Sequence, residues 1–155
     1  MVSVVLLAAG GACVPSDPGV SSEVAVRRSP GGEIEVASCS DDEFTDLRLV
    51  AVENPGEETR DDELLWRVTF DPAVSLESVV LGEVPDGGEE REPWPTQELV
   101  DRPDVLFVVT FRDPDSNARA ASFTLADLEG DTVWFDDEAM AEAELDASGD
   151  CEQGF

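Results

Sequence analysis

The sequence contains no histidine, lysine or tyrosine, and all nine of its basic residues are arginine. Without histidine there is no imidazole to act as a general base, to complete a Ser-His-Asp or Cys-His pair, or to bind a metal ion. Without lysine there is no amine for a Schiff base or a Ser-Lys pair. These absences predict a protein that is not an enzyme and has no cofactor. A hydrolase with paired carboxylates is the one catalytic hypothesis they leave open.

Positive charge is also scarce, because 37 acidic residues face nine basic ones and the net charge is -28. A field this negative repels nucleic acid and anionic lipid headgroups, so we expect neither as a partner. Runs of acidic residues are usually solvated surface. The alternative is that the acidic clusters at residues 61–63, 89–90 and 136–138 attract divalent cations.

Residues 1–12 form an uncharged apolar run that ends in small residues directly before Cys13. The run is too short to span a bilayer as a helix and suits an export signal. It resembles the lipobox of bacterial lipoproteins, although Gly10 replaces the usual Leu and no basic residue precedes the run. We predict a signal peptide over 1–12 and lipidation of Cys13. Plain secretion, or a first strand with a free Cys13, are the alternatives.

The segment from Cys13 to Gly32 is rich in serine, proline, glycine and valine. This composition is typical of a flexible linker, so we predict a tether over residues 13–32. The folded domain is then expected over residues 33–155. A lipid anchor at Cys13 would be the only contact of the protein with a membrane.

Two further cysteines, Cys39 and Cys151, flank almost the whole predicted domain. An even number of cysteines in an exported chain predicts a disulfide between them. The alternative is two buried thiols in a reducing compartment. No CxxC spacing and no histidine accompany the cysteines, so a zinc site is not expected.

The strongest strand pattern is Leu64–Phe70, in which Leu64, Trp66, Val68 and Phe70 alternate onto one side. Trp66 contributes the largest apolar surface to that side. Pro72 is expected to end the strand and Glu89 to Asp104 to form an irregular loop. Similar runs predict the other strands, at residues 33–38, 47–52, 78–84, 105–111, 119–125 and 132–135.

About seven strands without a long helical crossover favour an all-β fold, an antiparallel sandwich of immunoglobulin-like architecture. Trp66 would lie between the sheets, as the buried tryptophan does in immunoglobulin-like folds. The terminal positions of Cys39 and Cys151 differ from that family, so the resemblance is architectural. Residues 137–147 have helical composition and predict a short C-terminal helix or the frayed end of the last strand.

Asp113, Asp115 and Asn117 stand at the D-x-D-x-N spacing that begins an EF-hand calcium loop. Ala118 then replaces the expected glycine, and Thr124 stands where the bidentate glutamate should be. A hairpin turn is the competing interpretation, and these three residues are weak candidates for a metal site.

Trp94 lies between two prolines and is the aromatic residue most expected to be exposed. A rigid loop of this kind could present an anchor to a partner protein. The competing interpretation is that Trp94 folds back and caps an open end of the sandwich. Trp134 is expected in the core. Arg67 and Arg112 are expected to pair with carboxylates on the outward faces of strands.

The leader ending at Cys13, the early Cys39, the Leu65–Val68 strand, the Leu81–Pro85 segment and the late Cys151 also resemble small uncharacterised secreted proteins or lipoproteins of high-GC actinobacteria. The resemblance implies a location on the outer side of the cell membrane, lipid-anchored or secreted, and no reaction. The sequence thus predicts a non-enzymatic binding or structural module with an envelope or extracellular protein partner. A divalent-cation-dependent adhesion or sensor domain is the alternative.

Overall fold

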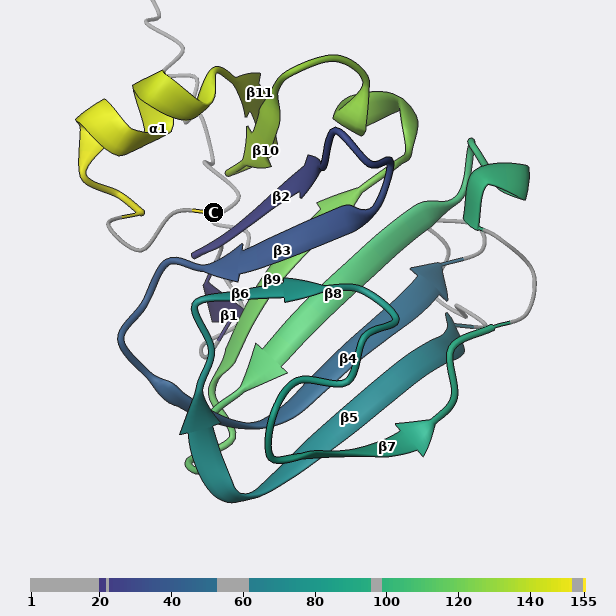
Figure 1. Ribbon diagram of the computed structural model, residues 1–155, viewed down its shortest axis with the longest axis vertical. Coiled ribbons are helices and arrows are strands. Elements are labelled where there is room, and N and C mark those ends of the chain that lie inside the picture. The colour runs from purple at the N-terminus through teal and green to yellow at the C-terminus, as the bar shows by residue number, and fades with distance from the viewer. Residues whose placement is uncertain (1–19, 22, 53–61, 96–98, 152–154) are drawn as a thin grey trace, which may run out of the picture.

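The computed structural model describes residues 20–21, 23–52, 62–95, 99–151 and 155, and these form an antiparallel β-sandwich (Figure 1). One sheet has six strands in the order β1 (Val20–Ser21), β9 (Ala118–Phe123), β8 (Leu106–Arg112), β4 (Glu43–Val52), β5 (Asp62–Ser75) and β7 (Gly88–Glu92). The other has five in the order β11 (Glu138–Met140), β10 (Val133–Phe135), β2 (Val24–Arg28), β3 (Ile34–Ser38) and β6 (Ser78–Val80). Within the described residues, only the β1–β9 pair is parallel.

The all-β sandwich is confirmed, and each of the seven predicted strands has a counterpart among β3, β4, β5, β6, β8, β9 and β10. The immunoglobulin-like arrangement stays a prediction. Short helical segments complete the described chain: η1 (Leu99–Asp101), η2 (Ala126–Leu128) and α1 (Glu142–Ser148). The predicted C-terminal helix is therefore present, and it begins after β11.

The core lies between the sheets and is built on alternating strand residues. Trp66 is fully buried and lies opposite Leu49 in the β4–β5 pair. Its indole Nε1 donates a hydrogen bond to Glu90 Oε1 at 3.1 Å, so the polar atom of this buried ring is satisfied. From the other sheet, Val26 and Val36 face the same core.

Trp66, Val68 and Phe70 are buried as predicted, whereas Leu64 is 41% exposed and Leu65 is buried in its place. The reason is a register shift in the β4–β5 pair between Leu49 and Val50, which interrupts the alternation just before Trp66.

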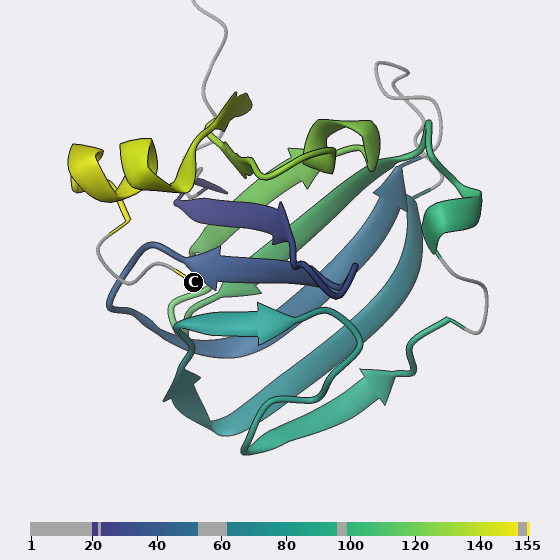
Figure 2. The same cartoon turned by 45° about the horizontal axis from the view of Figure 1, so that its top comes forward.

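Part of the outer face of the five-stranded sheet is also covered, because α1 packs against it (Figure 2). Ala25 and Ala37 point outward and are nevertheless fully buried, against Leu145 of α1 and Cys151. Small side chains at these positions allow a close approach of the C-terminal segment. The molecule is therefore three layers deep on this side.

The predicted disulfide is present. Cys39, directly after β3, is bonded to Cys151, and the two residues are 112 positions apart with Cα atoms 4.4 Å apart. The bond joins the end of β3 to the C-terminal segment and holds that segment against the five-stranded sheet. Phe155 is the last residue of that segment, and its ring lies 4.2 Å from the Arg27 guanidinium carbon.

Three sequence predictions about boundaries are wrong. The tether predicted over residues 13–32 includes β2, in which Val24 to Val26 are fully buried. Both faces of this strand are buried there, because the core lies on one side and α1 packs on the other. β5 does not end at Asp71 and continues through Pro72 to Ser75. The irregular loop predicted after Glu89 contains β7, whose charged residues are tolerated at the edge of the sheet.

Candidate functional site

The predicted calcium site is a hairpin turn between β8 and β9. The Asp113 carboxylate accepts hydrogen bonds from the backbone N–H and the side-chain Nδ2 of Asn117, both at 2.8 Å. Ser116 closes the turn with a positive φ of 70° and donates its backbone N–H to the Asp113 carbonyl. Both carboxylate oxygens of Asp113 are thus engaged within the turn, and Asp115 is exposed and does not converge on them. The geometry favours the hairpin interpretation.

Those hydrogen bonds also set the charge state of the turn. The side-chain hydrogen bond from Asn117 is the largest cause holding the pKa of Asp113 below its ordinary value, and backbone N–H groups of the turn act in the same direction. A carboxylate that accepts such bonds is stabilised in its ionised form.

The acidic clusters have structural roles where they are described. Glu63 pairs with Arg102 at 2.9 Å, and Glu89 pairs with Arg91 at 2.8 Å. Glu90 accepts the Trp66 indole N–H, and Asp137 accepts a hydrogen bond from Ser122 at 3.5 Å. Among the described residues, no three cysteine, aspartate or glutamate side chains are placed to hold a metal ion.

Trp94 does not project from the surface. Its ring is half-buried and meets Trp66 edge-on, with ring centroids 5.7 Å apart and an interplanar angle of 84°. It also lies directly over the backbone of Gly82. This position corrects the expectation of an exposed partner anchor and matches the competing one, in which the tryptophan caps the sandwich. Burying the Trp94 ring against Trp66 is more favourable than exposing that apolar ring to water.

The remaining sequence predictions have different outcomes. Arg67 pairs with Asp46 as expected, whereas Arg112 has no carboxylate partner in the described structure. Trp134 is half-buried rather than fully buried, and its Nε1 donates to the Ser122 carbonyl at 2.8 Å, joining the two sheets. Cys13, the predicted lipidation site, lies outside the described residues.

A groove runs along one end of the sandwich, and Arg28 is common to its three parts. These parts are hollows of about 210, 330 and 180 Å³. The first two share Pro30 and Asp131 besides Arg28, and the last two share Glu129. We call these three neighbouring hollows together the Arg28 groove. Its walls come from the β2–β3 hairpin, η2, the loop before β10, and the segment after η1.

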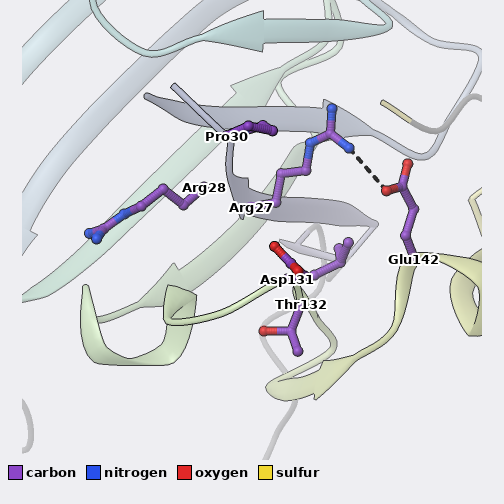
Figure 3. A pocket seen from close by; sticks show the side chains of 7 residues that line it. Arg27, Arg28, Pro30, Asp131, Thr132 and Glu142 are labelled. Atoms are coloured by element: carbon purple, nitrogen blue, oxygen red, sulfur yellow. Dashed lines mark hydrogen bonds and ion pairs between the residues drawn. The ribbon is translucent and has the colours of Figure 1, made fainter. Parts of the chain in front are cut away.

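The alternation of β2 places Arg28 in this groove. Val24 and Val26 face the core, so Arg28 extends their row to the end of the sandwich. Arg27 extends from the opposite face of β2 and lines only the first hollow, together with Glu142. Figure 3 shows the two arginine side chains diverging. Arg27 is held by Glu35 at 2.6 Å and by Glu142 at 3.1 Å.

Arg28 has no such partner. Its Nε atom is buried without a hydrogen-bond acceptor, and no carboxylate of the described residues forms an ion pair with it. Glu129 lines the same hollows yet is not bonded to it. In a chain with this excess of acid, a half-buried arginine with free donors is an unusual feature, because a buried donor without an acceptor costs about 1–3 kcal/mol.

The groove combines this cation with apolar walls. Val100 is 54% exposed, and with Pro103, Leu125 and Ala126 it forms the apolar side next to Arg28. Glu129 lines the same hollow as these apolar residues, and Asp131 lines the other two hollows. Such a site suits a ligand that carries one anionic group on a short apolar body. Ser29 also lines the groove, and its hydroxyl donates a hydrogen bond to Glu33 Oε2 at 3.3 Å.

Sequence reasoning missed Arg28. The signal that could have identified it was the alternation of Val24, Val26 and Arg28, which places a charged residue on the core-facing side of a strand. That strand was not predicted because the serine- and glycine-rich segments on either side of it are typical of a linker.

No helix in the described part of the chain is long and apolar enough to cross a membrane. Comparison of the chain with protein-family models, with curated proteins and with solved structures finds no match.

Proposed function

We propose that the protein is a non-enzymatic binding module that works outside the cytoplasmic membrane and holds its ligand in the Arg28 groove. The observation that carries the proposal is the position of Arg28, a half-buried cation with unused donors in an apolar-walled groove. The ligand class is a carboxylate or similar oxyanion on a small apolar body, because a guanidinium binds such groups through parallel hydrogen bonds.

The location outside the membrane is supported by the Cys39–Cys151 disulfide, since stable disulfides belong to oxidising compartments. The apolar run before Cys13 fits the same location, either through lipidation or through secretion. A protein bound to the envelope by a lipid would present the groove to the exterior. This part of the proposal is tested by mass spectrometry of the membrane fraction, in which diacylglyceryl on Cys13 is the expected modification and an intact Met1 on exported protein would oppose it.

Binding is tested by following arginine side chains during a titration with sodium butyrate. The chain has nine arginines and no lysine, so a ¹H–¹⁵N spectrum of the arginine Nε groups is sparse enough to assign. We expect the Arg28 resonance to shift saturably with butyrate and not with butanol or with sodium chloride at equal ionic strength. Equal, linear shifts at all arginines would overturn the proposal.

The matched variants are Arg28→Gln and Arg91→Gln. Arg91 lies on β7, where its exposed guanidinium pairs with Glu89, so its loss removes the same charge away from the groove. For the variants the readout is the backbone amide resonance of Val100, which lines the same hollow as Arg28. We expect Arg28→Gln to abolish its saturable shift with butyrate and Arg91→Gln to retain it. Loss of the response in both variants would mean that net charge, not the groove, controls binding.

A further inference from the structure

A second group of arginines surrounds one buried carboxylate on the outer face of the six-stranded sheet. The Asp46 side chain on β4 is 8% exposed and accepts hydrogen bonds from Arg48 Nε at 2.9 Å and Arg67 Nε at 2.7 Å. Arg48 and Arg67 lie directly opposite each other in the β4–β5 pair. One carboxylate therefore fixes two guanidinium groups side by side, with their side chains 31% and 40% exposed.

Arg112 adds a third cation to this group. It lies opposite Asp46 in the β4–β8 pair, but Asp46 is already occupied by the other two arginines. Arg112 Nη1 donates only to the Ser116 carbonyl at 3.3 Å, and its Nε is buried without an acceptor. Glu92 lies opposite Arg67 in the β5–β7 pair, and within the described structure no ion pair joins them. Positive charge is therefore in local excess here.

An apolar row adjoins the arginines on the same face. Val108, Val50 and Leu64 lie in register across β8, β4 and β5, and Leu64 is 41% exposed. The helix α1 packs against the other sheet and does not cover this row. We call the surface formed by Arg48, Arg67, Arg112, Val50, Val108 and Leu64 the arginine face.

We propose that the arginine face docks an acidic segment of another protein, one that presents carboxylates beside apolar side chains. Charge complementarity selects this occupant, because three arginines gather here around a single carboxylate on a protein whose net charge is -28. Asp46 holds two of the arginines in place before the partner arrives, which lowers the entropy cost of binding. A second copy of this chain is disfavoured by the repulsion between two strongly negative molecules. The inference does not depend on the Arg28 groove.

The test uses a fluorescein-labelled peptide of alternating glutamate and leucine, followed by fluorescence anisotropy at about 0.1 M salt. At that ionic strength the Debye length is about 10 Å, so distant repulsion is screened while direct contacts persist. We expect saturable binding of this peptide and none of its glutamine–leucine counterpart. Binding of both peptides alike would overturn the proposal, since it would show that carboxylates are not recognised.

Arg112→Gln is the decisive variant, because it removes a cation that no carboxylate depends on and leaves Asp46 paired. We expect it to weaken binding about tenfold, the loss of one charge-assisted hydrogen bond. Arg27→Gln and Arg28→Gln, which alter β2 of the other sheet, should change affinity less than twofold. Equal weakening by all three variants would overturn the proposal, as would self-association of the unmodified protein that Arg112→Gln abolishes in sedimentation. Unfolding in urea confirms that Arg112→Gln is folded.

Discussion

Adjacent residues of this protein meet opposite environments, and Arg27 and Arg28 show it most clearly. Arg27 points outward, where Glu35, Glu142 and the Phe155 ring surround it. Arg28 points along the core side to the end of the sandwich and meets no carboxylate of the described residues. Because successive side chains of β2 point to opposite faces, Arg27 has a structural role and Arg28 keeps its donors available for a ligand.

Gly82 is a residue whose lack of a side chain has a clear structural reason. Its φ is +92°, and a Cβ atom there would lie 2.8 Å from the Trp94 ring. We expect Gly82→Ala to lower the free energy of unfolding by about 1–2 kcal/mol for the left-handed backbone and by about 1–3 kcal/mol more for the clash with the ring. Urea unfolding measures the loss.

Gly130→Ala is the matched control. Gly130 has a similar φ of +86°, but no atom lies within 4 Å of the position that a Cβ would occupy there, so only the backbone cost applies. Equal losses of stability in the two variants would show that Trp94 does not pack on Gly82.

The turn at Asp113 predicts a dependence of stability on pH. Because the pKa of Asp113 is lower in the folded protein than its ordinary value of about 3.9, the unfolded chain binds the proton more tightly. The ionised carboxylate therefore stabilises the fold above about pH 4, and this contribution is lost as the pH falls through the folded value. We expect the stability difference between the native protein and Asp113→Ala to shrink between pH 6 and pH 2.

Asp115→Ala provides the comparison for this experiment, since Asp115 is exposed in the same turn. Chemical unfolding at a series of pH values should show no comparable change for that variant. A pH-independent difference for Asp113→Ala would contradict the assignment of the hydrogen bonds to the ionised form.

At the scale of elements, α1 and the disulfide form a unit that covers the five-stranded sheet. Leu145 is 1% exposed and packs with Ala25, Ala37 and Phe135. A helix of seven residues is too short to be stable alone. Its position therefore depends on Cys151 and on this apolar contact.

Removing the disulfide should loosen that unit first. We expect the double variant Cys39→Ser/Cys151→Ser to lose about 2–5 kcal/mol of stability, since the bond closes a long loop. Hydrogen exchange should accelerate in α1, β10 and β11 well before β4, β5 and β8. Uniform acceleration, or an unchanged urea midpoint, would contradict a clasping role for the bond.

Elements that follow one physical signal were predictable from the sequence, and those that depend on neighbours were not. β5 and β8 alternate strongly, and the Cys39–Cys151 pair follows from the number and position of the cysteines. β2 was missed because its burial on both faces requires α1, which comes at the far end of the chain. β7 was missed because its charged sequence is tolerated only at a sheet edge.

The site was harder to predict than the fold. The calcium-like spacing and Trp94 are prominent in the local sequence, and both are explained by local packing. Arg28 and the arginines around Asp46 acquire their character from strands distant in sequence. Whether a charge is paired depends on register, and residue type does not encode register.

At the scale of the whole molecule, the net charge of -28 opposes folding through self-repulsion. We expect the melting temperature to rise when sodium chloride increases from about 10 mM to 1 M, because the Debye length falls from about 30 Å to about 3 Å. Differential scanning calorimetry measures the change.

Calcium chloride at matched ionic strength separates screening from specific binding. With no metal-binding group among the described residues, we expect the same melting temperature in both salts. A further rise that saturates with calcium would instead support the divalent-cation alternative, because binding to the native state raises its stability by mass action.

The contact between Trp66 and Trp94 gives the protein an intrinsic spectroscopic probe. The chain has three tryptophans and no tyrosine, so its near-ultraviolet signals come chiefly from indoles and phenylalanines. Two of the indoles form a perpendicular pair beside β7, and Trp134 lies apart, bridging the sheets near the C-terminal layer. Excitonic circular dichroism would follow the first region and the emission of a Trp134-only variant the second, so two parts of the sandwich can be watched without any attached dye.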